Sequence, residues 1–161
     1  QHHFFGILLG QTIGIPMEDV PYQGSAPMLI GVMGGQISAG IDVLGSSLEQ
    51  HRAGKVRVVA VSSPQRVPQL PDVPTFAELG YPNITGMGFN ALYAPSGVSQ
   101  QVVATWSQAL TKVLADPGVR EQLMQQGSLP VGKGPEDLAT RGREAAARWA
   151  PIIKASGFVA D

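Results

Sequence analysis

The sequence of 161 residues contains no cysteine and few charged residues. The missing cysteine excludes disulfide bonds and thiolate chemistry. Charged residues make up 14% of the chain and the formal net charge is −1, so no basic field points to nucleic acid as a partner. No apolar run reaches the ~20 residues that a membrane-spanning helix needs. Hydrophobic residues make up 43% of the chain, which suits one ordinary domain or two small lobes with a packed core.

The beginning of the chain lacks two common features. It starts with Gln1 instead of methionine, and no basic leader with an apolar stretch follows. We therefore expect that residue 1 is not the natural start and that a segment precedes it. The absence of cysteine is also compatible with an oxidising compartment.

Short β-branched runs alternate with helical patterns along the chain. Strands are predicted at Val20–Tyr22, Ile37–Val43, Val56–Ser62 and Met87–Pro95. Helices are predicted to begin near Phe4, Ser25, Ser46, Thr75, Ser99, Pro117 and Pro135. This alternation is typical of an α/β fold with a mainly parallel sheet, whose ligand sites lie at the carboxyl ends of the strands.

Side chains that satisfy free backbone N–H groups mark several of these helix starts. Ser46–Glu49 and Thr75–Glu78 each fit a capping box, in which a hydroxyl and a carboxylate accept from the first turn reciprocally. Ser99 and Asp116 are predicted to cap the helices that follow them. Pro151 lies within the last helix, where its missing N–H predicts a kink.

The stretch VPYQGSAP, residues 20–27, connects a predicted strand to a helix through small residues. The N–H groups of Gly24, Ser25 and Ala26 are predicted to lack intrahelical partners, and the helix dipole adds roughly half a positive charge there. With the Ser25 hydroxyl as a further donor, the turn could hold a carboxylate. An ordinary turn that binds nothing is the alternative. The Tyr22 ring likewise could contact a ligand or belong to the core.

No arrangement of residues indicates catalysis or a metal site. His2 and His3 are neighbours whose side chains diverge on a helix, His51 lies in a polar segment, and no HExxH pattern accompanies them. Ser46 and Ser47 are better explained as capping residues than as nucleophiles, because no GxSxG elbow is present. We therefore expect no enzymatic activity, no cofactor and no metal.

Seven motifs occur in order between about Phe4 and Asp161. They are VPYQGSAPML, GGQISAGID, HRAGKVRVVAVSS, PQLPDVPTFAELGYP, LYAPSGV, ADPGVREQL and RWAPIIKASGF. In these motifs the chain resembles the periplasmic solute-binding receptors of tripartite tricarboxylate transporters, the Bordetella uptake gene (Bug) family. The resemblance implies a periplasmic-binding-protein-like fold of type II, the Venus flytrap architecture, in which two α/β lobes close around a small organic anion.

The resemblance also implies how the chain divides. Residues 1–84 correspond to the second α/β lobe with the anion-binding turn. Residues 85–161 correspond to a crossing strand and the C-terminal helices of the first lobe, whose N-terminal portion is expected to be missing. The apolar faces of the helices that carry Trp106 and Trp149 must then pack on something else. Self-association with a second copy of the chain is one option.

In the family, the loop at residues 22–26 holds one carboxylate of the ligand. The implied ligand-binding residues are Tyr22, Gly24, Ser25, Ala26, Asp42 and Asn90. Asp42 could orient a ligand hydroxyl or amine or fix a water, and its alternative role is to cap the following turn. Phe89 and Asn90 are placed in the crossing strand, with core packing favoured for Phe89. The family often has lysine at the position of Gln23, so binding here would depend on backbone N–H groups and a hydroxyl.

The function implied by the resemblance is the capture of a solute without covalent chemistry. We expect a bacterial periplasmic protein, exported by a signal peptide not present in this chain. It would bind a small organic carboxylate and deliver it to the membrane components of a tripartite transporter, with the ligand stabilising the closed lobes. One alternative is an effector-sensing domain of a regulator or sensor with the same fold. Another is an enzyme acting on a carboxylic acid, which lacks a catalytic constellation.

Overall fold

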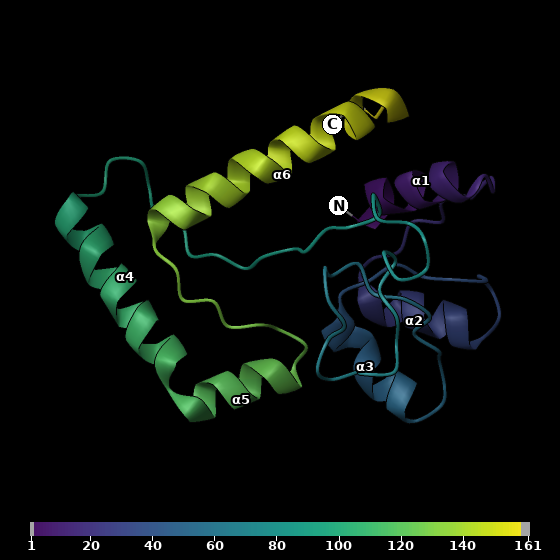
Figure 1. Ribbon diagram of the computed structural model, residues 1–161, viewed down its shortest axis with the longest axis horizontal. Coiled ribbons are helices and arrows are strands. Elements are labelled where there is room, and N and C mark those ends of the chain that lie inside the picture. Colours follow the sequence, from purple (N-terminus) through teal and green to yellow (C-terminus); the bar gives the residue numbers. More distant parts are fainter. Residues whose placement is uncertain (1, 159–161) are drawn as a thin grey trace. The chain divides into compact units, whose positions relative to one another are not determined.

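The computed structural model describes residues 2–158, which form six α-helices (Figure 1). The chain divides into two compact units, Gln1–Met87 with Pro151–Asp161 and Gly88–Ala150. The division into lobes at residues 1–84 and 85–161 refers to the complete receptor and stays a prediction. None of the helices in the described range is long and apolar enough to cross a membrane.

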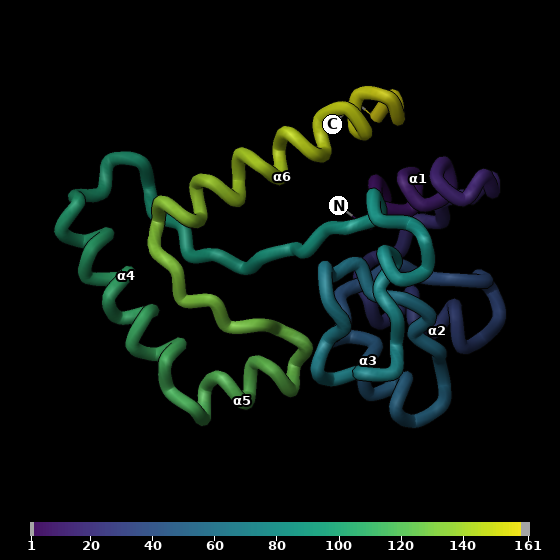
Figure 2. The backbone as a smooth tube through the Cα atoms, viewed as in Figure 1, coloured from purple at the N-terminus to yellow at the C-terminus, as the bar shows by residue number. Residues whose placement is uncertain are grey.

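The first unit contains α1 (His2–Ile13), α2 (Ser25–Met33) and α3 (Leu44–Arg52), drawn from purple to blue in Figure 2. α2 contacts α3. The core of this unit combines side chains of α3 with apolar residues of the segment that follows it: Leu44, Leu48, Val58, Val61, Val67, Leu70 and Val73. Burial of a leucine or valine side chain of this kind contributes about 1.5–3 kcal/mol, so this cluster stabilises the segment between α3 and the second unit.

The four predicted strands do not form a sheet within residues 2–158. One isolated parallel bridge joins Val61 to Thr75. There, the Val61 N–H donates to the Pro74 carbonyl oxygen at 3.0 Å, and the Phe76 N–H donates to the Val61 carbonyl oxygen at 3.1 Å. The strands predicted at Val20–Tyr22, Ile37–Val43, Val56–Ser62 and Met87–Pro95 are therefore wrong for this structure. β-branched residues favour a strand only where a neighbouring strand pairs with it, and the described chain supplies no such ladder.

α3 begins earlier than the sequence predicts. Its first residue is Leu44, and the N-cap Val43 makes no side-chain hydrogen bond. The Ser47 hydroxyl donates to the Leu44 carbonyl oxygen at 3.2 Å, so Ser46–Glu49 does not act as a capping box. The earlier start places Leu44 and Leu48 on one face of the helix, four residues apart, where both join the core. Hydrophobic packing thus overrides the capping preference.

The other predicted capping residues are confirmed. The Thr75 N–H donates to the Glu78 carboxylate at 2.8 Å, and the Glu78 N–H donates to the Thr75 hydroxyl at 3.1 Å. This box closes a hydrogen-bonded turn and not the small helix that the sequence predicts. The Ser99 hydroxyl and the Asp116 carboxylate each accept an N–H from three residues later, at 3.4 Å and 3.0 Å. Local capping rules therefore fix the starts of the next two helices.

The second unit contains α4 (Gln100–Ala115) and α5 (Pro117–Gln125), which contact each other. α6 (Pro135–Ser156) begins in this unit, and the division between the units falls at Pro151 within the helix. Trp149 in α6 is buried. Phe89 is 42% exposed, so the core role predicted for it is wrong in this structure.

α4 carries an apolar face without a single buried residue. Its members are Val102, Trp106, Leu110 and Val113, which are between 38% and 57% exposed. These four positions recur at helical spacing, so they form one stripe along the helix. The apolar face predicted for this helix is present, and nothing among the described residues buries it.

Candidate functional site

The turn before α2 has a backbone conformation that requires glycine. Gly24 is the N-cap of α2, with φ 100° and ψ −179°. Its N–H donates to the Tyr22 carbonyl oxygen at 2.9 Å. The prediction of three free N–H groups is therefore wrong for Gly24, whose amide is occupied by a local turn. An added Cβ at Gly24 would meet no atom within 4 Å, so the side of the turn that glycine leaves bare is open.

Two N–H groups at the start of α2 remain without a protein acceptor. Ser25 and Ala26 are the first two residues of the helix, and no backbone or side-chain oxygen in the described range accepts from their N–H groups. Pro27, the third residue, has no N–H to satisfy. Ser25 is half-buried and Ala26 is exposed. Two donors at the positive end of the helix dipole form an arrangement that favours an anion.

Asp42 contacts this turn through Ser25. The Ser25 hydroxyl donates to Asp42 Oδ1 at 2.8 Å. The hydroxyl is therefore occupied and is not a free donor for a ligand, contrary to the sequence interpretation. Asp42 does not cap the turn that follows it either, because α3 begins after Val43 without a side-chain cap. Asp42 Oδ2 is buried and has no hydrogen-bond partner among residues 2–158.

Tyr22 packs on α2. A Cβ added at Gly31 would lie 2.5 Å from the Tyr22 hydroxyl oxygen, so the ring occupies the space that this buried glycine leaves. Of the two roles predicted for Tyr22, packing in the core therefore applies to the end of the ring that lies against Gly31, while the side chain as a whole is half-buried. Asn90 is exposed and belongs to the second unit. Its predicted role as a ligand contact stays a prediction.

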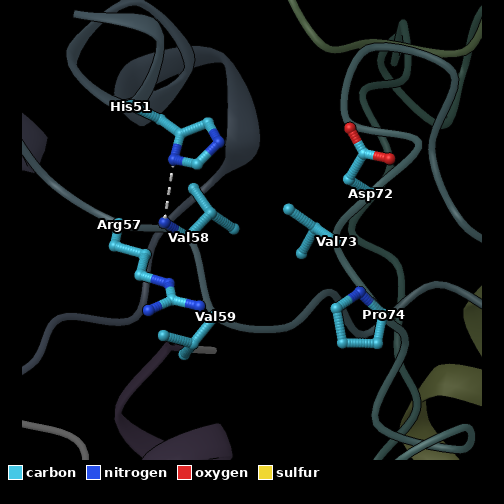
Figure 3. A pocket seen from close by; sticks show the side chains of 7 residues that line it. All are labelled: His51, Arg57, Val58, Val59, Asp72, Val73 and Pro74. Carbon is cyan, nitrogen blue, oxygen red and sulfur yellow. Dashed lines mark hydrogen bonds between the residues drawn. The ribbon is translucent and has the colours of Figure 1, made fainter. Parts of the chain in front are cut away.

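A pocket of about 230 Å³ lies elsewhere in the first unit (Figure 3). Its lining consists of His51, Arg57, Val58, Val59, Asp72, Val73 and Pro74. His51 Nδ1 accepts the Val58 N–H at 3.2 Å, drawn as the dashed line in Figure 3. None of the predicted ligand-binding residues lines this pocket. The sequence did not predict this pocket. Its lining comes from two separate segments, residues 51–59 and 72–74, and no sequence motif links them.

Two carboxyl groups that are not part of the turn, Glu78 and Asp137, have a lowered pKa. The pKa of Glu78 is lowered first by the hydrogen bond from the Thr75 N–H and then by Arg66, whose Nε donates at 3.0 Å. The pKa of Asp137 is lowered chiefly by its hydrogen bond with Arg141. No group of three or more His, Cys, Asp or Glu side chains in residues 2–158 could hold a metal ion. The turn therefore offers two kinds of polar group: the backbone N–H donors of Ser25 and Ala26, and the carboxylate of Asp42.

The sequence matches a family whose description fits this chemistry. The model of the "Tripartite tricarboxylate transporter family receptor" matches residues 3–158. The chain belongs to this family. The family is one of solute-binding receptors and not of enzymes, which agrees with the expectation drawn from the sequence motifs.

Relatives in the family place the chain within a longer fold. It is 31% identical to protein BugT of Bordetella pertussis, over 98% of this chain and 48% of BugT. The periplasmic binding protein BugD has a TM-score of 0.84 and 31% identity, over 97% of this chain and 53% of that one. The chain thus spans about half the length of the relatives it matches. The predicted fold class, an α/β periplasmic-binding-protein-like architecture present in part, is confirmed.

Two similar structures contain dicarboxylates. An R. palustris protein solved with adipate has a TM-score of 0.88 and 30% identity, over 97% of this chain and 52% of that chain. MatC from Rhodopseudomonas palustris, with bound malate, has a TM-score of 0.84 and 28% identity, over 94% of this chain and 53% of that chain. Two proteins to which this chain is similar over about half their length were thus solved with a small organic dicarboxylate.

Proposed function

We propose that this chain is part of an extracytoplasmic receptor that binds one carboxylate of a small organic acid at the start of α2. The observation that carries the proposal is the pair of Ser25 and Ala26 N–H groups, which have no acceptor within the described residues. They follow Gly24, whose missing side chain leaves the approach open. The adipate and malate found in similar structures support a carboxylate as the ligand.

The physical basis of binding is a charge-assisted pair of hydrogen bonds. Each hydrogen bond from a backbone N–H to a carboxylate contributes about 1.5–3 kcal/mol. The positive end of the α2 dipole adds to this attraction. No bond of the ligand has to break, because a receptor needs only to bind the acid and to favour one conformation when bound.

Membership of the family supports a proposal for the wider role. We propose that the complete receptor works in the periplasm, reaches it through a signal peptide, and delivers its ligand to the membrane components of a tripartite transporter. The roles of Tyr22 and Asn90 as ligand contacts are part of this proposal. Self-association through the incomplete first lobe, by the apolar faces of the helices that carry Trp106 and Trp149, stays a prediction.

The test removes one donor from the turn and leaves the helix intact. Proline is compatible with the first turn of a helix, so Ala26→Pro removes the Ala26 N–H at little structural cost. The affinities of the full-length gene product for adipate and malate are measured by isothermal titration calorimetry. We expect the substitution to weaken the tighter of the two by roughly 10- to 150-fold, the equivalent of one charge-assisted hydrogen bond.

A matched control carries the same substitution at the same position of another helix. Gln101 is the second residue of α4, as Ala26 is of α2. Gln101→Pro should leave both affinities unchanged. The proposed site is contradicted if the Ala26→Pro protein binds both acids with wild-type affinity. The comparison requires that this variant and the Gln101→Pro control have the same unfolding midpoint. A wild-type protein that binds neither acid nor any other small carboxylate contradicts the function itself.

A further inference from the structure

The parallel bridge at Val61 stops after a single residue, and Pro74 is the reason. At the bridge, the Val61 N–H donates to the Pro74 carbonyl oxygen at 3.0 Å, and the Phe76 N–H donates to the Val61 carbonyl oxygen at 3.1 Å. In a parallel ladder the same exchange would repeat two residues earlier, at Val59. The Val59 carbonyl oxygen would then accept from the N–H of residue 74, and proline has none. The bridge therefore cannot extend from Val61 to Val59.

The peptide groups of Val59 are left without partners. No group among residues 2–158 is hydrogen-bonded to its N–H or to its carbonyl oxygen. Other residues of the same segment are paired, since the Val58 N–H donates to His51 Nδ1 at 3.2 Å and the Ser62 carbonyl oxygen accepts the Gly86 N–H at 3.0 Å. An unpaired N–H and carbonyl oxygen in an extended segment form a template on which another extended chain can pair.

The pocket of about 230 Å³ opens at the place where the ladder stops. Residues 57–59 lie on one side of it and residues 72–74 on the other, as Figure 3 shows. Four of its seven lining residues are apolar, and of these Val73 is buried whereas Val59 is 69% exposed. A gap between two chain segments, with apolar walls and unpaired peptide groups on one side, has the form of a site for an added strand.

Positive charge gathers next to this pocket. Arg52, Lys55 and Arg57 lie within six residues of the chain, with no acidic residue between them. All three are exposed, and none forms an ion pair with another described residue. Arg57 lines the pocket, and Asp72 is the one acidic group in the lining. Cations therefore prevail here although the formal net charge of the chain is −1, and such a field favours an acidic partner.

We propose that Val59 and the pocket beside it dock an extended, acidic segment of a partner protein. The segment adds a strand at Val59, whose N–H and carbonyl oxygen bond to its backbone. One aliphatic side chain of the segment enters the pocket, and its acidic side chains meet Arg57 and the neighbouring cations. The site shares no residue with the turn before α2, so this inference does not depend on the proposed function.

Two synthetic peptides test the proposal. The probe is a fluorescein-labelled, amidated pentapeptide in which glutamate and valine alternate, and the matched control has lysine in place of each glutamate. Fluorescence polarisation with the full-length gene product measures both dissociation constants. The glutamate peptide should bind at least about tenfold more tightly than the lysine peptide, because the cations beside the pocket attract one and repel the other. Its affinity should fall as the salt concentration rises.

Pro74→Val supplies the N–H that the ladder lacks. This N–H can donate to the Val59 carbonyl oxygen, so the ladder extends and closes the site. We expect the glutamate peptide to bind about fivefold or more weakly, the equivalent of losing one or two backbone hydrogen bonds. Pro64→Val is the matched control, because Pro64 is exposed and does not line the pocket. It should bind the peptide as the wild type does.

Charge substitutions test the pocket if Pro74→Val does not fold. Arg57→Glu should weaken binding of the glutamate peptide by about fivefold, and Asp72→Asn should strengthen it by about twofold, because the two substitutions change the local charge in opposite directions. Lys112 is an exposed cation of α4 and does not line the pocket. Lys112→Glu is therefore the control and should leave the affinity unchanged.

Several results would overturn the inference. One is equal binding of the two peptides, and another is an unchanged affinity in folded Pro74→Val or Arg57→Glu. A wild type that sediments as a dimer, and as a monomer after Pro74→Val, makes a second copy of the chain the occupant in place of a partner protein. A monomeric wild type that binds neither peptide indicates that other residues of the complete protein cover Val59. The affinities for adipate and malate should be the same in Pro74→Val as in the wild type, so failure here is distinct from failure of the proposed function.

Discussion

Gly24→Ala should destabilise the protein through the backbone alone. Gly24 has φ 100° and ψ −179°, a region that residues with a side chain rarely adopt. No atom lies within 4 Å of the Cβ that alanine would add, so the cost contains no contact with a neighbour. Strain of this kind costs about 1–3 kcal/mol per residue. We expect the free energy of unfolding to fall by about that amount.

The measurement is urea denaturation followed by circular dichroism, with Gly97→Ala as the matched control. Gly97 also lies in a turn with no atom within 4 Å of an added Cβ, but its φ is not positive. The control should change the free energy of unfolding by no more than about 0.5 kcal/mol. If the two variants are equally stable, the backbone at Gly24 is not held in this conformation. The alignment of the Ser25 and Ala26 N–H groups, and with it the proposed anion site, would then be wrong.

Two further substitutions test the packing and the electrostatics of the first unit. Leu48→Ala should lower the free energy of unfolding in urea by about 2–5 kcal/mol, because this side chain is 2% exposed and its loss leaves a cavity; a loss below 1 kcal/mol would contradict its place in the core. Glu78→Gln tests the lowered pKa that the Thr75 N–H and Arg66 produce. A depressed pKa gives stability that is present above the ordinary carboxyl range and lost as the pH falls through the folded value. Wild type and variant should therefore differ at neutral pH and converge in acid, and a pH-independent difference would refute this assignment.

Helix boundaries were readable from the sequence wherever the signal is local. Ser99 and Asp116 cap α4 and α5 through residues three positions away, and the Thr75–Glu78 box forms its predicted hydrogen bonds. The start of α3 was missed because it depends on Leu44 reaching a core that is built from distant segments. A capping preference of about 1 kcal/mol is smaller than the burial of a leucine side chain.

Strands and site contacts were less predictable because both depend on partners far along the chain. The run at Val56–Ser62 has the composition of a strand, but a ladder requires a neighbour, and within residues 2–158 only Val61 has one at Thr75. The fold class was still correct, since the order of the motifs identifies the family without needing each strand. At the site, the small-residue turn before a helix predicted the free N–H groups of Ser25 and Ala26 but not the bond of the Gly24 N–H to Tyr22. The hydrogen bond of the Ser25 hydroxyl to Asp42 joins residues 17 apart. No local pattern encodes such a contact.

The bare apolar face of α4 gives the protein an internal optical reporter. Trp106 on that face is 57% exposed, whereas Trp149 in α6 is 9% exposed. Indole fluorescence moves to longer wavelength in water, so the two side chains should emit at different wavelengths. With Trp149 replaced by phenylalanine, the emission of Trp106 would shift toward blue whenever another surface covers α4, and would record that event without an added dye.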